Sequence, residues 1–208
     1  MKNSVYIIIL LAVALLIVSY KLVSESNEAP APDSNLNNAI ENIMTRSSIR
    51  AYTSQNISDG LMDTLLRAAM AAPTAGNKQP WRFVVIRDTT TLRYIAANFG
   101  PMKMMNTANA AVVVCGDMND TFPGDGRDYW VQDASAATEN LLLAAHASGL
   151  GAVWCGVYPM PERVAAFSEL LKLPADIIPL NCIALGYPQE PGQPKDKWKP
   201  QNIHYETW

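Results

Sequence analysis

The apolar and polar positions of the chain predict strands and helices that interleave irregularly. Nearly continuous apolar ranges, which are typical of strands covered on both faces, lie at 81–87, 110–117, 151–157 and 178–185. Helical spacing of apolar residues predicts three helices. The first covers 36–45, the second begins after the capping residue Ser58, and the third covers 129–148, where Gly149 closes the last turn. No G-x-G-x-x-G pattern joins a strand to a helix, so the sequence does not predict a dinucleotide-binding Rossmann unit.

An apolar run at the start of the chain stands apart from this pattern. It extends from Val5 to Val18 behind Lys2, and Lys21 could lengthen it to Val23 by placing its charge at the membrane surface. A run of this length lies between the core of a signal peptide and a short membrane span. We therefore expect three parts: a signal anchor or signal peptide at 1–23, a flexible linker at 24–35 and a folded domain at 36–208.

The charges around the apolar run predict its orientation. Lys2 precedes the run, whereas Glu25, Glu28 and Asp33 follow it. Because positive residues that flank a span stay in the cytoplasm, we expect a membrane-anchored or exported protein whose domain lies on the extracytoplasmic side.

Composition narrows the class of protein. Of the 208 residues, 49% are hydrophobic and 17% are charged, which suits one sizeable core. The net charge is −3 and no long basic run occurs, so we expect no nucleic-acid partner. Three cysteines without motif spacing predict neither a disulfide framework nor a metal site.

Two short polar runs carry the candidate chemistry. The first, Arg46 to Arg50, combines two guanidinium groups with two hydroxyls, which can bind a phosphate monoester. The second, Pro73 to Trp81, places amide side chains just before a predicted strand. Each run alone is also compatible with a solvated helix end or a polar turn. Together they indicate a cofactor with a phosphate at one end and a polar ring at the other, which is the shape of flavin mononucleotide (FMN).

These two runs, in this order, resemble the nitroreductase family of FMN-dependent oxidoreductases. The resemblance continues through Trp154-Cys155-Gly156, the segment 184–188 and the basic tail 195–198, and it covers roughly residues 39 to 208. It implies an α+β fold in which helices flank a mixed sheet of four strands. It also implies an intertwined homodimer with both active sites at the subunit interface and an exchanged C-terminal tail, for which residues 202–208 are suited.

The resemblance also implies which residues bind FMN. The phosphate and ribityl chain would be held by Arg46, Ser47 and Ser48, with Arg50 nearby, and by two residues of the tail, Lys195 and Lys197. The isoalloxazine ring would lie against Trp154, Cys155 and Gly156. The same flavin would be faced from the other subunit by Pro73, Thr74, Asn77 and Gln79.

The implied function is reduction of nitroaromatic, quinone or similar small-molecule acceptors by NAD(P)H, in a ping-pong hydride transfer through flavin N5. The flavin performs this chemistry, so no protein residue is required as a nucleophile or an acid–base catalyst. Two alternatives remain open at this point. One is an FMN-dependent dehalogenase or flavin-fragmenting relative, and the other is a membrane-tethered electron-relay module without a dedicated substrate.

Overall fold

The computed structural model describes residues 34–208. The chain divides into two units, Met1–Glu41 and Asn42–Trp208, and the architecture below is that of the second unit. The predicted leader at 1–23 and most of the predicted linker lie outside the described residues. Ser34 and Asn35 belong to the first described helix, so the division into leader, linker and domain stays a prediction.

Helices, short 3-10 turns (η) and strands alternate along the chain. In order, they are α2 (Ser34–Thr45), α3 (Asp59–Met70), η1 (Ala75–Asn77), β1 (Trp81–Ile86), α4 (Thr89–Asn98), η2 (Gly100–Asn106), β2 (Ala110–Asp117), η3 (Gly124–Asp128), α5 (Tyr129–Ala147), β3 (Gly151–Gly156), α6 (Pro161–Leu171), β4 (Ile177–Gly186) and η4 (Pro200–Asn202).

Local sequence signals account for several of these boundaries. Ser58 caps α3 as predicted, since its hydroxyl accepts a hydrogen bond from the Leu61 N–H at 3.3 Å. Asp88 caps α4 in the same way through the Thr91 N–H, at 2.8 Å. Gly149 follows α5 with φ of 74°, a left-handed conformation that favours glycine.

The four strands form one sheet in the order β1-β2-β4-β3. This confirms the expected α+β fold with four strands and flanking helices. All three strand pairings in the sheet are antiparallel, which corrects the expectation of a mixed sheet. A parallel pairing occurs instead as an isolated bridge between Ser48, which lies outside the strands, and Ala152 of β3.

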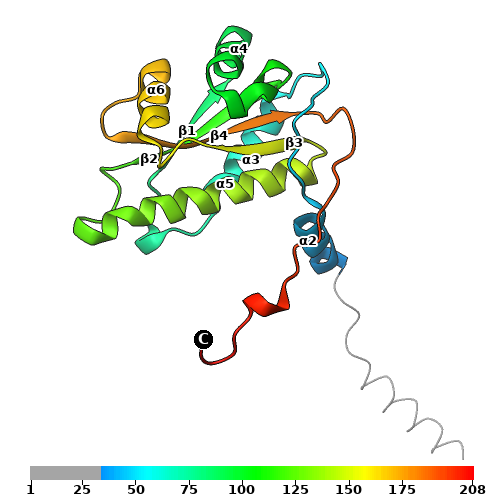
Figure 1. Cartoon of the computed structure of the whole chain (residues 1–208), viewed down its shortest axis with the longest axis vertical. Helices are drawn as coiled ribbons and strands as arrows, with labels where there is room; N and C mark the ends of the chain where they lie inside the picture. The colour runs from blue at the N-terminus through cyan, green and yellow to red at the C-terminus, as the bar shows by residue number, and fades with distance from the viewer. Residues whose placement is uncertain (1–33) are drawn as a thin grey trace, which may run out of the picture. The chain divides into compact units, whose positions relative to one another are not determined.

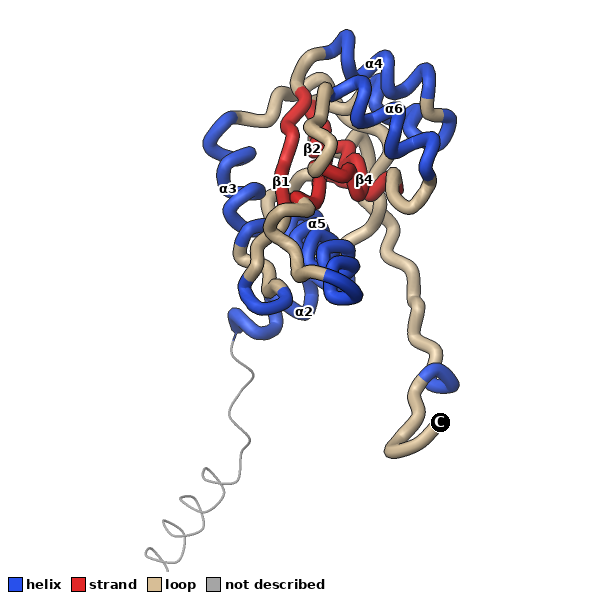
Figure 2. Tube along the Cα trace, turned by 90° about the vertical axis from the view of Figure 1, so that its left-hand side faces the viewer, coloured by secondary structure: helices blue, strands red, loops and turns tan. Residues whose placement is uncertain are grey.

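The sheet lies between two layers of helices. Figure 1 shows α5 along one face of the sheet, while α4 and α6 cover the other face. The perpendicular view in Figure 2 shows the same three layers. Both faces of the central strands are therefore covered, which explains why β2 and β4 are nearly continuous apolar runs.

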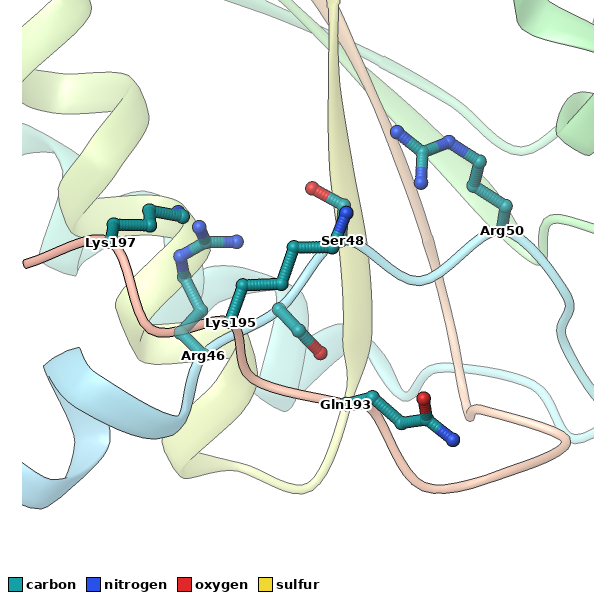
Figure 3. A pocket seen from close by; sticks show the side chains of 7 residues that line it. Arg46, Ser48, Arg50, Gln193, Lys195 and Lys197 are labelled. Carbon is teal, nitrogen blue, oxygen red and sulfur yellow. The ribbon is translucent and has the colours of Figure 1, made fainter.

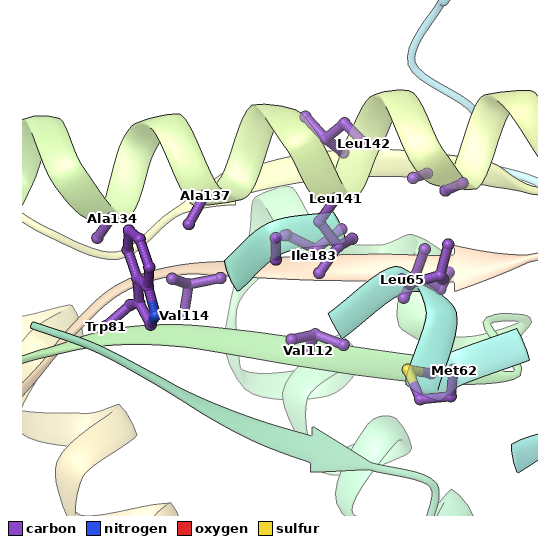
Figure 4. Packing of buried hydrophobic residues seen from close by; sticks show 14 of the residues in the cluster. Met62, Leu65, Trp81, Val112, Val114, Ala134, Ala137, Leu141, Leu142 and Ile183 are labelled. Atoms are coloured by element: carbon purple, nitrogen blue, oxygen red, sulfur yellow. The ribbon is translucent and has the colours of Figure 1, made fainter. Parts of the chain in front are cut away.

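Two hydrophobic clusters fill the spaces on either side of the sheet. On the α5 side, Val112 and Val114 of β2 pack with Leu141 of α5 and Leu65 of α3, as Figure 4 shows. On the opposite side, Val113 joins a cluster that includes residues of α4, η2 and α6. Successive residues of β2 thus point to opposite clusters, as the alternation of side chains along a strand requires.

Candidate functional site

The predicted phosphate-binding run, Arg46 to Arg50, lies beside the edge strand β3. The Ile49 N–H donates to the Ala152 carbonyl at 3.0 Å, next to the parallel bridge between Ser48 and Ala152. Gly151 permits this close approach, because a Cβ at that position would lie 2.7 Å from the Ile49 Cβ. The run is therefore held in an extended form against the sheet.

The C-terminal tail returns to the same run after β4. The Thr53 N–H donates to the Tyr187 carbonyl at 2.8 Å, and the Gln189 N–H donates to the Ala51 carbonyl at 3.0 Å. Farther along, Gly192 lies against Ser47, and a Cβ at this position would displace the Ser47 hydroxyl. These contacts bring the basic part of the tail close to the run.

A cationic cavity of about 330 Å³ lies where the run and the tail meet. It is lined by Arg46, Ser47, Ser48, Arg50, Gln193, Lys195 and Lys197. In Figure 3, the side chains of Arg50 and Lys195 extend toward Ser48 from opposite sides. All six residues that the sequence assigns to the phosphate end therefore lie around one cavity.

The charges around this cavity are far from balanced. Four of its lining residues are cations, namely Arg46, Arg50, Lys195 and Lys197. Among the ion pairs formed by the described residues, one involves this group: the Arg46 Nε lies 3.5 Å from a carboxylate oxygen of Glu139. An excess of positive charge beside two hydroxyls is suited to a dianionic ligand such as a phosphate monoester.

A second cavity, of about 180 Å³, adjoins the first at Arg50. It is lined by Arg50, Pro101, Met102, Met104, Val153, Trp154, Cys155, Gly156 and Arg163. Three of these residues are the predicted ring-binding segment at the end of β3. Their strand is held by Arg163 of α6, whose Nη1 donates to the Gly156 carbonyl at 3.0 Å.

Cys155 adds no negative charge to the second cavity at neutral pH. Its thiol is buried and lies 3.9 Å from the Met104 sulfur. Burial raises the pKa of this thiol, although the positive charges of Arg50 and Arg163 act in the opposite direction. The residue therefore presents a neutral, polarisable wall.

The second predicted run, 73–79, lies elsewhere in the subunit. Pro73, Thr74, Asn77 and Gln79 line neither of the two cavities. The segment is tightly turned, because Asn77 and Gln79 both have left-handed φ angles, 54° and 50°. Their side chains meet, since the Gln79 Nε2 donates to the Asn77 Oδ1 at 2.8 Å.

Several residues of the site were not predicted from the sequence. Gln193 could have been predicted from its spacing. Residues 193, 195 and 197 alternate along an extended tail, so their side chains lie on the same side. Arg163, Met102 and Met104 had no such signal. They reach the second cavity from α6 and η2, and no local pattern indicates how these helices pack on the sheet.

Comparison with known proteins identifies the family. The model of the nitroreductase family matches residues 43–101 and 95–187. A protein of Archaeoglobus fulgidus assigned as an NADH dehydrogenase/NAD(P)H nitroreductase is 46% identical over 170 residues, covering 80% of this chain and 96% of the relative. A protein of Methanothermobacter thermautotrophicus with the same assignment is 42% identical over 170 residues, covering 81% of this chain and 87% of the relative. The chain belongs to the nitroreductase family.

Solved structures of nitroreductase-family proteins share its fold. An NADH dehydrogenase/NAD(P)H nitroreductase from Parabacteroides distasonis superposes with a TM-score of 0.77 at 39% identity, over 82% of this chain and 98% of that one. A nitroreductase from Desulfovibrio desulfuricans, solved in complex with FMN, superposes with a TM-score of 0.70 at 31% identity, over 86% of this chain and 99% of that one.

The comparisons correct the expected location of this nitroreductase-family protein. The two archaeal relatives are NAD(P)H nitroreductases by name, which does not indicate a membrane-anchored or exported protein. No helix within residues 34–208 is long and apolar enough to cross a bilayer. We therefore withdraw the extracytoplasmic location and the membrane contact. The apolar run at 5–18, on which they rested, lies outside the described residues.

Proposed function

We propose that this chain is an FMN-dependent NAD(P)H oxidoreductase that reduces nitroaromatic, quinone or similar small-molecule acceptors. The observation that carries the proposal is the meeting of the cationic cavity and the second cavity at Arg50. The first cavity offers charge-assisted donors, and the second offers an aromatic, sulfur-rich wall. FMN has the matching pair of ends, a phosphate and an isoalloxazine ring.

The residues present fit the phosphate end of FMN. Arg46 and Lys197 supply positive charge, and Ser47 and Ser48 supply hydroxyl donors to phosphate oxygens. Glu139 occupies the Nε edge of Arg46, so the terminal nitrogens of its guanidinium remain for the ligand. Lys195 is placed to share the phosphate charge from the tail.

The residues at the other end fit a planar ring. Trp154 is 36% exposed at the mouth of the second cavity, whereas Cys155 is 7% exposed. The bound flavin supplies hydride transfer between NAD(P)H and an oxidised acceptor. Arg50 lines both cavities, so its positive charge would favour the negative charge that a bound flavin gains on reduction. The backbone of residues 154–156 would orient the ring, and no side chain needs to act as a nucleophile.

Relatives support this assignment. A Bacillus subtilis relative, 24% identical over 187 residues, is named an FMN reductase (NADPH). A Salmonella typhimurium relative, 27% identical over 160 residues, is named an oxygen-insensitive NADPH nitroreductase. A Vibrio harveyi NADPH:FMN oxidoreductase that superposes with a TM-score of 0.74 at 25% identity was solved with NAD⁺.

The proposal includes a homodimer. Because 73–79 lies apart from both cavities of its own subunit, we assign Pro73, Thr74, Asn77 and Gln79 to the flavin of the opposite subunit. The tail supports such an exchange, since Tyr205 and Trp208 are 82% and 99% exposed in the single chain. Aromatic side chains so exposed gain apolar burial by docking on a partner.

Steady-state kinetics of the FMN-loaded protein test the function. We expect oxidation of NADH or NADPH that depends on a nitroaromatic or quinone acceptor, with the parallel double-reciprocal lines of a ping-pong reaction. Size measurement of the same sample should give a dimer. A protein that retains FMN but does not oxidise either nicotinamide would contradict the proposed activity, and a monomer with full activity would contradict the shared site.

A further inference from the structure

We propose that Asp133 of α5 positions the segment 74–79, and thereby the polar side chains that this segment presents to the flavin. The Asp133 Oδ1 accepts a hydrogen bond from the Ala75 N–H at 2.9 Å, across 58 positions of sequence. The consequence for flavin binding rests on the proposed function. The contact itself is a property of the single chain.

Asp133 is unusual because it is an acidic residue in a buried position. It is 6% exposed and lies on a helix whose other buried residues are mostly apolar. A buried carboxylate is costly unless hydrogen bonds compensate it, and such a residue is seldom found inside without a partner. The Ala75 N–H supplies that partner.

The turn at Ala75 needs a hydrogen-bond acceptor from elsewhere in the chain. Thr74 occupies the N-cap position of η1 but makes no side-chain capping bond there. Its hydroxyl accepts instead from the Gln79 N–H at 3.2 Å. The first free N–H of the turn is therefore satisfied by Asp133, in the role that an N-cap side chain usually fills.

The segment requires such an anchor because its backbone is strained. Gly76, Asn77 and Gln79 all have positive φ, a conformation that is unfavourable for the two residues that are not glycine. The ring of Phe122 packs against the segment, since a Cβ at Gly76 would lie 2.6 Å from that ring. The Lys78 ammonium lies 5.2 Å from the centre of the same ring. Asp133 adds a charge-assisted contact at the start of the turn.

The conformation determines where the amide side chains point. Asn77 and Gln79 are joined by a side-chain hydrogen bond that exists in this turned backbone. If the Ala75 contact is lost, the backbone can relax toward negative φ, and both amides then turn away from their present direction. Asp133 is accordingly a positioning residue that acts through Ala75.

Two variants remove this contact from opposite sides. Asp133→Ala removes the acceptor. Ala75→Pro removes the donor at the first position of the 3-10 turn, where proline is tolerated, and Thr74 already has the extended conformation (φ −136°, ψ 154°) that a following proline requires. Asp133→Asn keeps an Oδ1 acceptor and serves as the conservative variant. Asp63→Ala, an exposed acidic position on α3, is the matched control.

Two readouts separate positioning from general stability. The first is hydrogen exchange of the peptide that contains Ala75, measured without flavin. The second is the FMN dissociation constant of the 208-residue chain. Loss of a hydrogen bond to a charged group predicts that Asp133→Ala speeds exchange and weakens FMN binding, each by about tenfold or more. Asp133→Asn should keep the exchange rate and the FMN affinity close to their wild-type values, and Asp63→Ala should change neither quantity.

The double variant gives the sharpest result. Because both substitutions break one contact, Asp133→Ala combined with Ala75→Pro should weaken FMN binding by clearly less than the product of the two separate effects. Unchanged exchange and affinity in both single variants, or fully multiplicative effects, would overturn the inference. If Asp133→Ala does not fold, Ala75→Pro decides the question, because it removes the donor of the same contact, and Asp133→Asn should still resemble the wild type. A wild-type chain that binds no FMN would overturn the proposed function, whereas the exchange data would still test the contact.

Discussion

The Nε atom of Arg46 lies 3.5 Å from a carboxylate oxygen of Glu139, so α5 holds one edge of a guanidinium whose other edge faces the cationic cavity. Arg46 is largely covered, with 18% of its side chain exposed, whereas Glu139 is half exposed. The pair thus orients an arginine that would otherwise sample many rotamers. We expect phosphate binding in this cavity to depend on this orientation as well as on charge.

Arg46→Ala should weaken FMN binding by about 2 kcal/mol or more, which corresponds to roughly a thirtyfold rise in the dissociation constant. The reason is the loss of a partly buried, charge-assisted donor to phosphate. Fluorescence titration with FMN measures the change. Arg93→Ala, on the exposed side of α4, is the matched control and should leave the affinity unchanged. Equal affinities for the wild type and Arg46→Ala would mean that the run is an ordinary helix end.

The two tail lysines should act on the phosphate in particular. Lys195→Ala combined with Lys197→Ala should weaken FMN binding and reduce its dependence on salt, because fewer charges contact the phosphate. Binding of riboflavin, which lacks the phosphate, should change little. Lys199→Ala serves as the control, since Lys199 does not line the cavity. Equal losses for FMN and riboflavin would show that the tail supports the fold rather than the phosphate.

Gly116→Ala should lower the free energy of unfolding by about 1–3 kcal/mol, because an added methyl group overpacks a buried site. A Cβ at this position of β2 would lie 2.3 Å from the Trp130 Cε3, and Trp130 is itself buried. Gly60→Ala is the control, since a Cβ at Gly60 meets nothing within 4 Å. Urea denaturation compares the two variants, and a Gly116→Ala variant as stable as wild type would contradict the packing described between β2 and α5.

The free energy of unfolding should fall as the pH rises above about 9. Burial raises the pKa of the Cys115 thiol to about 12, whereas the same thiol ionises near its ordinary pKa in the unfolded chain. The buried thiol therefore makes its full contribution to stability below the pKa of the unfolded chain. This contribution is lost as the pH rises from the unfolded pKa to the folded pKa, by up to about 1.4 kcal/mol per pH unit for each such thiol. Urea titrations at pH 7, 9 and 10 measure the slope. Cys115→Ala should have a shallower slope than wild type, and an identical slope would contradict the prediction.

The strands and three helices of the fold could be predicted from the sequence. Residues 110–117 are apolar because both faces of β2 are covered, and Ser58 and Gly149 mark helix ends through local hydrogen bonding and φ. α4 and α6 were not predicted. In α6 a single residue, Phe167, is buried, so the apolar positions of this helix give a weak signal.

The cluster from Arg46 to Arg50 could be recognised because its members are neighbours in sequence, whereas the tail lysines were grouped with it through the family resemblance. Arg46 to Arg50 forms one wall of the cationic cavity, and the tail lysines complete it. Arg163 and Asp133 were missed because each acts through a single contact with a distant backbone group, the Gly156 carbonyl and the Ala75 N–H. Such contacts depend on tertiary packing and leave no local pattern.

We expect FMN bound by this chain to take electrons from NAD(P)H. The most direct test is the visible absorption spectrum of the FMN-loaded 208-residue protein, recorded without oxygen during addition of NADH and then of NADPH. We predict that the flavin band bleaches with a stoichiometric amount of at least one nicotinamide and returns when a nitroaromatic or quinone is added. A spectrum that shows no bound flavin after reconstitution, or a bound flavin that neither nicotinamide bleaches, would contradict electron transfer from NAD(P)H to FMN on this chain.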